Sequence, residues 1–418
     1  MRWGLPVFIL CLPLEFTSQV LRLQLARIVL IVVGVAFAYL VVIGERKLVA
    51  PLSRSVIPLV LFIAISVAGW LFTRALGSFN PLLDVAAYPL MALLVINLTR
   101  GERQLDKAWL AFLISALAIA LLSAFLYYAH LSIWRPDVTT PLHRVNATFG
   151  DPNILARFLT LGVSAAILLF AGRRQKRWLV ICVALVGAAV LPLTFSKSAY
   201  LFFPLSIVMA VILGASRRRA ALLSVATLAI FAAAILVNPA TRDRSVVVLQ
   251  TITGTTQYAA QPAQSSGATE ALQLDSVRTY LIRAGWQMFK DHPVFGIGYG
   301  GFQHSLLTEY RSFLPPGQPV VTLSHTSTIT ILAEQGATGA GLLLAFLVLL
   351  GWEVTRSLTR RTEWRDLVVT PAFLIVPIVL FSQLEGRLIE EPYLWLAIGL
   401  VYSARMLERS APTLQIPG

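Results

Sequence analysis

The stretch RRRAALLSVATLAIFAAAILVN, residues 217–238, places three arginines directly before an apolar run. No charged residue interrupts that run, and about 20 apolar residues in an α-helix are enough to cross a bilayer. The backbone must then form a helix, because lipid offers no partners to free N–H and C=O groups. The stretch therefore predicts a membrane-spanning helix with a basic end.

Apolar runs of this kind recur along the 418 residues, and the chain is 57% hydrophobic and 13% charged. Soluble chains carry about 25% charged residues, and a membrane β-barrel would show short alternating segments. We therefore predict an all-α polytopic membrane protein with about twelve transmembrane helices, of which the first is short enough to be interfacial. The predicted spans are residues 4–16, 24–43, 56–74, 80–98, 108–130, 154–171, 178–195, 199–214, 220–238, 338–354, 367–382 and 391–406.

Basic residues concentrate in alternate connections from the second predicted span onward. The positive-inside rule assigns such connections to the cytoplasm. It also accounts for the net charge of +14, so no nucleic-acid partner is expected. Twelve spans would place both termini inside. The basic connections contain Arg46, Lys47 and Arg54; Arg100, Arg103 and Lys107; Arg173, Arg174, Lys176 and Arg177; Arg217, Arg218 and Arg219; and Arg356, Arg360, Arg361 and Arg365.

The outer side then receives one large segment between the ninth and tenth predicted spans. Its residues Leu281, Ala284 and Met288 follow Val277 at the spacing of an amphipathic helix, which Pro293 ends. We expect three regions along the chain. They are an N-terminal transmembrane region (1–238, about nine spans), the large outer segment (239–337) and a C-terminal transmembrane region (338–418, about three spans).

Four stretches carry recognisable motifs on this outer side. In order they are ATFGDPNILARFL (147–159), LTFSKSAYL (193–201), SVRTYLIRAGWQMFKDHPVFGIGYGGF (276–302) and the run from His325 to Gly339. Together they resemble the O-antigen ligase and polymerase family of bacterial inner-membrane proteins. Three positions depart from the family pattern. Lys197 and Ser198 stand where a Ser-Arg-Gly turn is usual, and Thr326 stands at a usual Asn.

The resemblance implies a glycosyltransferase. Its donor would be a glycan on undecaprenyl pyrophosphate, and its acceptor lipid A–core or another glycan. The active site would face the periplasm from a multi-pass protein embedded in the lipids of the inner membrane. A repeat-unit polymerase of O-antigen or exopolysaccharide remains an alternative, and so does a polysaccharide or lipid transporter. No cofactor or metal is expected, because arginine and lysine would neutralise the leaving group.

The resemblance also points to catalytic residues. His325 is the candidate general base, because an imidazole titrates near neutral pH. Arg278 and Lys197 are the candidate ligands of the pyrophosphate. Lysine keeps the positive charge of the usual arginine but loses its bidentate fork. Either the site binds phosphate as a point charge, or another arginine, such as Arg157 or Arg283, supplies the fork.

Further residues are expected around this centre. Asp151 and Asn153 would shape the mouth of a lipid groove or simply cap a helix. Glu334 would orient His325 or cap a helix. Glu385, Arg387, Glu390 and Glu391 crowd the last outer connection, where they would form a solvated ion-pair cluster, pair with Arg278 or line the acceptor site.

Overall fold

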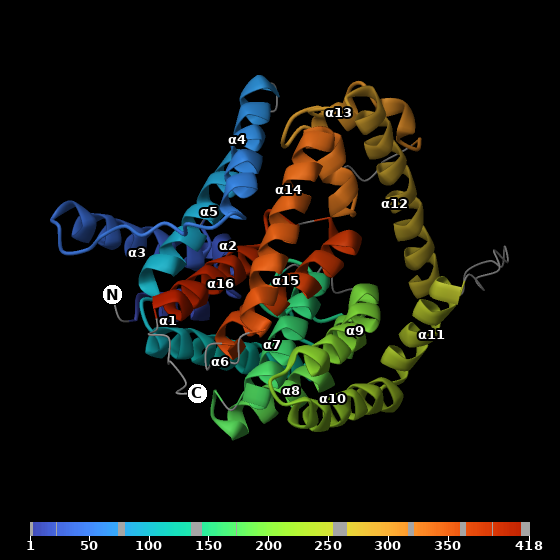
Figure 1. Ribbon diagram of the computed structural model, residues 1–418. Helices are drawn as coiled ribbons and strands as arrows, with labels where there is room; N and C mark the ends of the chain where they lie inside the picture. The colour runs from blue at the N-terminus through green and yellow to red at the C-terminus, as the bar shows by residue number, and fades with distance from the viewer. Residues whose placement is uncertain are drawn as a thin grey trace.

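The computed structural model describes residues 3–21, 23–73, 80–134, 144–172, 174–253, 266–316, 322–359, 365–386 and 388–410. Every regular element in these ranges is a helix (Figure 1). The all-α prediction is therefore confirmed. The helices that precede the outer segment are α1 (Gly4–Cys11), α2 (Thr17–Leu21), α3 (Leu25–Val42), α4 (Val56–Thr73), α5 (Asn80–Leu98), α6 (Glu102–Tyr128), α7 (Pro152–Gly172), α8 (Arg177–Val190), the 3-10 helix η2 (Leu191–Thr194), α9 (Lys197–Leu213) and α10 (Arg217–Val237).

The outer segment and the C-terminal part are helical as well. Figure 1 shows α11 and α12 running in yellow along one side of the molecule, with α14 upright near its centre. The elements are α11 (Pro239–Thr253), α12 (Ser266–Asp291), α13 (Phe302–Leu307), the 3-10 helix η3 (Arg311–Phe313), α14 (Ser327–Thr359), α15 (Arg365–Glu385) and α16 (Pro392–Ser410).

Each predicted span from residue 24 onward coincides with one of these helices. By length and composition, seven helices in the described ranges can cross a membrane, and α4, α5 and α9 contain shorter apolar segments. The first predicted span differs. It contains only α1, whose eight residues reach about 12 Å, whereas the hydrocarbon core of a bilayer is about 30 Å thick. Helix α1 therefore cannot cross alone.

Helix α7 is the centre of the bundle. Of its most apolar stretch 89% is buried, and it packs against α6, α8, α9, α10 and α15. Small residues permit the close contacts. A Cβ added at Gly162 would lie 2.8 Å from the Cβ of Ala116, and one at Gly187 would lie 2.7 Å from Val163. Small residues let transmembrane helices approach in this way.

The outer segment has a core of its own. Leu281, Ala284 and Met288 of α12 are fully buried and pack with Phe302 of α13 and Ala333 of α14. The predicted amphipathic face is thus confirmed at these three α12 positions. Its burial against α14 fixes α12 beside the start of that helix.

Candidate functional site

His325 lies in a backbone turn immediately before α14. Its φ is +59°, and its side chain is half-buried. Gly386, directly after α15, packs against its backbone: a Cβ at Gly386 would lie 2.9 Å from the His325 Cα. Gly386 has φ +77°, a conformation that glycine adopts without strain. The end of α15 therefore meets the predicted base by direct backbone contact.

The hydroxyls that follow His325 attach α14 to α15. Ser327 Oγ lies 2.8 Å from Ser382 Oγ, and Thr328 Oγ1 donates to Gln383 Oε1 at 2.7 Å. The hydroxyls of Ser327 and Thr328 thus bond to α15. They hold the His325 turn against that helix.

Helix α14 is interrupted at Gly336, whose φ and ψ are +64° and −165°. A helix break leaves backbone groups without partners, and at membrane depth protein must supply them. The glycine loop 293–298 does so. Its amides donate to the carbonyls of Ala333 and Glu334 at 2.9 Å each, and the amide of Ala337 donates back to the loop at 2.8 Å. The glycine cluster of the sequence is therefore the partner of the break.

The side chain of Glu334 also connects α14 to the segment that follows the glycine loop. It is 5% exposed, and its carboxylate accepts a hydrogen bond from the backbone N–H of Phe302 at 3.1 Å. Phe302 is the first residue of α13, so Glu334 ties that helix to α14. The described contacts of its carboxylate are with this backbone, and none of them joins it to His325.

Lys197 begins α9 at a sharp turn. Phe195, two residues earlier, has φ +51°. Arg144 Nε donates to the carbonyl of Thr194 at 3.0 Å, and Arg244 Nε donates to the carbonyl of Phe195 at 3.3 Å. Three cationic side chains from three parts of the chain therefore lie at this turn.

Arg144 and Arg244 were missed by the sequence reading. Both fall on the predicted outer side, where the positive-inside rule makes basic residues less common. An arginine there is a signal of a structural or binding role.

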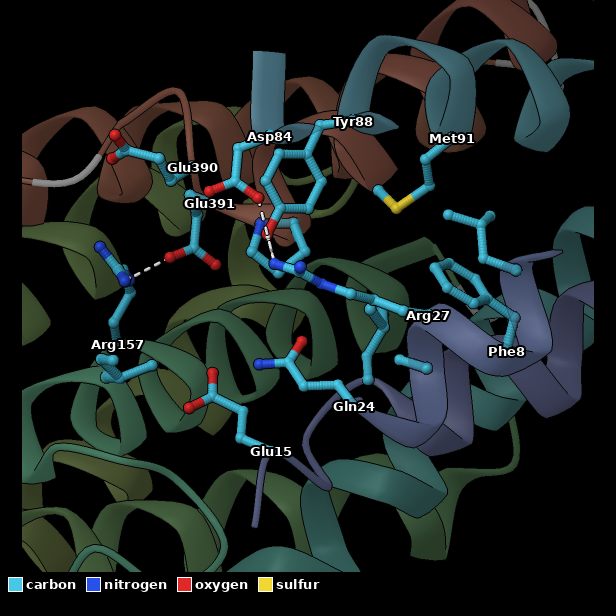
Figure 2. A pocket seen from close by; sticks show the side chains of 15 residues that line it. Phe8, Glu15, Gln24, Arg27, Asp84, Tyr88, Met91, Arg157, Glu390 and Glu391 are labelled. Carbon is cyan, nitrogen blue, oxygen red and sulfur yellow. Dashed lines mark hydrogen bonds and ion pairs between the residues drawn. The ribbon is translucent and has the colours of Figure 1, made fainter. Parts of the chain in front are cut away.

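Arg157 is a buried arginine at the other end of the site. It is 2% exposed and forms ion pairs with Glu385, at 3.2 Å, and with Glu391 (Figure 2). These two carboxylates are 7% and 3% exposed. The prediction of a solvated ion-pair cluster is therefore wrong for Glu385 and Glu391. Both carboxylates pair with Arg157, because α7, the end of α15 and the start of α16 converge at this point.

Asp151 and Asn153 shape the start of α7. The Asp151 Oδ1 accepts a hydrogen bond from the Asn153 amide at 2.6 Å, and the Asp151 carbonyl accepts from Ile154 at 3.1 Å. This is a helix-capping arrangement. Arg144 donates to Asn153 Oδ1 at 3.3 Å, which links this cap to the turn before Lys197.

Two further predicted residues belong to α12. Arg278 is half-buried and Arg283 exposed, both on α12. The described contacts do not connect them with Lys197 or His325. Arg387 lies outside the described residues.

The two residues Glu385 and Gly386, called the corner below, contact several of these residues. Glu385 pairs with Arg157 and also interacts with Ser198, the neighbour of Lys197. Gly386 follows it and contacts His325. The corner thus brings together the ends of α7, α9 and α15 with the start of α14. The corner thereby links the backbone of the His325 turn to Ser198 at the start of α9.

Comparison with known proteins supports the resemblance seen in the sequence. The sequence model of the family described as O-antigen ligase matches residues 182–344, from within α8 into α14. The matched segment contains Lys197, Arg278 and His325 with three of the four motifs. No curated protein matches the chain. The resemblance is confirmed: residues 182–344 of this chain match the O-antigen ligase family.

Proposed function

We propose that this protein transfers a glycan from undecaprenyl pyrophosphate to lipid A–core at the periplasmic face of the inner membrane. The match of residues 182–344 to the O-antigen ligase family supports a membrane enzyme that acts on glycan and lipid substrates. The observation that carries the finer proposal is the Glu385–Gly386 corner. It puts the His325 backbone and the cationic turn of Lys197 on either side of one short segment.

The reaction needs a base and a stabilised leaving group. The oxygen of an acceptor hydroxyl attacks the anomeric carbon of the donor sugar, and the bond from that carbon to the pyrophosphate oxygen breaks. The hydroxyl proton passes to His325, and undecaprenyl pyrophosphate leaves with the bonding electron pair. Lys197 and Arg278 stabilise the negative charge that develops on it.

Arg144 and Arg244 extend this cationic site in the proposal. Lysine binds phosphate as a point charge, whereas an arginine offers a planar fork of donors. The usual arginine is a lysine in this chain, and two arginines bond to the carbonyls directly before it. They are better placed than Arg157 to supply the planar donors, because the Arg157 guanidinium is bound by two buried carboxylates.

The test is transfer in vitro with purified protein, lipid-linked glycan and lipid A–core. Wild-type protein is expected to transfer, also in EDTA, because side-chain cations neutralise the leaving group. His325→Ala and His325→Gln are expected to abolish transfer while donor binding and the thermal unfolding midpoint stay unchanged. Near-normal transfer in either variant removes His325 as the base.

A deletion strain separates the acceptors. Loss of all capped core bands on a lipopolysaccharide gel, with accumulation of lipid-linked polymer, is the expected result for a ligase. Core carrying a single repeat unit would instead identify a polymerase. A purified protein that moves lipid-linked glycan across vesicles without any transfer would identify a transporter.

A further inference from the structure

A cavity of about 140 Å³ is lined by Arg157, the partner of Glu385, and by other residues outside the matched segment 182–344. Helices α1, α3, α5 and α7 form its walls, together with the start of α16. Figure 2 shows Gln24 and Glu15 pointing into it from below, with Arg27 and Arg157 on opposite sides. One wall is apolar and includes Phe8.

The charges of the cavity exclude the donor pyrophosphate. Four carboxylates line it, from Glu15, Asp84, Glu390 and Glu391, against the guanidiniums of Arg27 and Arg157. Both guanidiniums are engaged: Arg27 pairs with Asp84 at 3.0 Å, and Arg157 pairs with Glu391 and Glu385. An anion would meet a net negative wall. The donor pyrophosphate therefore binds elsewhere, and the Lys197 turn is the place proposed for it.

A metal ion is also a poor occupant. Among the residues described here, no group of three or more His, Cys, Asp or Glu side chains is placed to hold one. What the wall offers is carboxylate oxygens, which accept hydrogen bonds from donors and can each accept more than one. Gln24 adds an amide that both donates and accepts. Sugar hydroxyls supply such donors, and the apolar wall suits the C–H face of a sugar ring.

The size and position of the cavity limit which ligands it can bind. Pockets for drug-sized ligands measure about 300–1,000 Å³, so this cavity accommodates about one sugar ring. Arg157 lines it and pairs with Glu385, whose neighbour Gly386 contacts His325. These contacts link the cavity to the backbone of the His325 turn. The cavity lies outside residues 182–344, so it can differ among proteins that share the donor chemistry.

We infer that this cavity is the acceptor subsite, and that it binds an uncharged or amine-bearing sugar ring of the acceptor. The inference rests on the proposed transferase function. In this inference α1, α3 and α5 determine which acceptor is bound. The cationic turn at the start of α9 binds the donor.

Two variants test the subsite, each with a matched control. Ala26→Phe fills the cavity from α3, whereas Ala36→Phe adds the same ring to an exposed face of the same helix. Gln24→Leu removes the amide, with Gln104→Leu on α6 as its control. We expect each cavity variant to raise the acceptor KM about tenfold or more, about 1.4 kcal/mol of binding, with an unchanged donor KM. Both controls should behave as wild type.

Direct binding separates this inference from the transferase proposal. Glucose, galactose, glucosamine and inorganic pyrophosphate are titrated against the full-length protein, with thermal unfolding as the readout. At least one sugar should raise the midpoint of wild type but not of Ala26→Phe. Pyrophosphate should stabilise both proteins and compete with no sugar.

The outcomes point to different failures. Sugar binding without any transfer would overturn the transferase and leave the cavity a sugar site. Transfer with an unchanged acceptor KM in Ala26→Phe and Gln24→Leu, or competition between pyrophosphate and sugar, would overturn the subsite. Absence of sugar binding to wild type would overturn it as well.

Discussion

Arg157 shows how one buried charge is held in an apolar bundle. Its guanidinium contacts two carboxylates that are themselves buried. Removing one partner of such a pair is costly, because the other charges stay buried without compensation. We therefore expect Arg157→Met to lower the free energy of unfolding by about 3–5 kcal/mol.

The measurement is thermal unfolding in detergent, with two comparisons. Arg283→Met on the exposed face of α12 should change stability by less than about 0.5 kcal/mol. Adding Glu391→Gln to Arg157→Met should restore part of the loss, because one uncompensated charge is removed. A stable Arg157→Met protein that has lost donor binding would show instead that Arg157 binds the substrate.

The Lys197 turn gives a second residue-scale prediction. Lys197→Ala should slow transfer about a hundredfold, which corresponds to about 3 kcal/mol of lost transition-state stabilisation. Lys197→Arg should retain activity, because it restores the residue usual at this place in the family. Initial rates at saturating acceptor measure both. A folded but inactive Lys197→Arg protein would favour a packing role for Lys197.

Arg144→Lys and Arg244→Lys test the fork at the same turn. Each keeps a positive charge and loses the planar pair of donors. We expect both to raise the donor KM and leave the acceptor KM unchanged. If the donor KM is normal in both, these arginines only stabilise the turn through their bonds to Thr194 and Phe195.

The sequence identified candidate site residues better than it predicted which residues they contact. His325 and Lys197 stood out because their motifs resemble those of a family. The ion pairs of Arg157 depend on three helices that are far apart in the sequence, and no local pattern reports such a meeting. Glu385 and Glu391 therefore read as exposed charges, although the bundle buries them.

At the scale of elements, the break in α14 and the glycine loop form one unit. Gly336 occupies a region of φ and ψ that is essentially limited to glycine, where another residue costs about 1–3 kcal/mol. A Cβ there would also overlap the backbone of the loop, and a Cβ at Gly296 would overlap the backbone of α14. The sequence indicated turns at these glycines but not that the two backbones bond to each other.

The same helix provides the control for a test of this unit. Gly336→Ala should lower the unfolding midpoint and displace the His325 turn, so that transfer is lost as well. Gly341→Ala, where an added Cβ meets nothing within 4 Å, should leave stability unchanged or raise it by up to about 1 kcal/mol. A Gly336→Ala protein as stable as wild type would mean that α14 tolerates a continuous helix.

At the scale of the whole molecule, the length of α1 decides the side on which the chain begins. Helices from α3 onward follow the predicted spans, and their orientation rests on the basic connections. If α1 does not cross, the N-terminus lies on the outer side, opposite to the twelve-span prediction. The outer position would also put α1 on the same side as the cavity that it helps to line.

Cysteine labelling tests this topology in intact cells. With Cys11 and Cys182 replaced by serine, Trp3→Cys should react with a membrane-impermeant maleimide, because Trp3 is 65% exposed and α1 reaches only about 12 Å. A reporter fused after Arg218 should be cytoplasmic, and one inserted near Ser265 periplasmic. Protection of Trp3→Cys with both reporters as expected would restore twelve spans. If both reporters lie on the same side, the assignment of the basic connections is wrong, and with it the side on which His325 and the Lys197 turn meet the substrate.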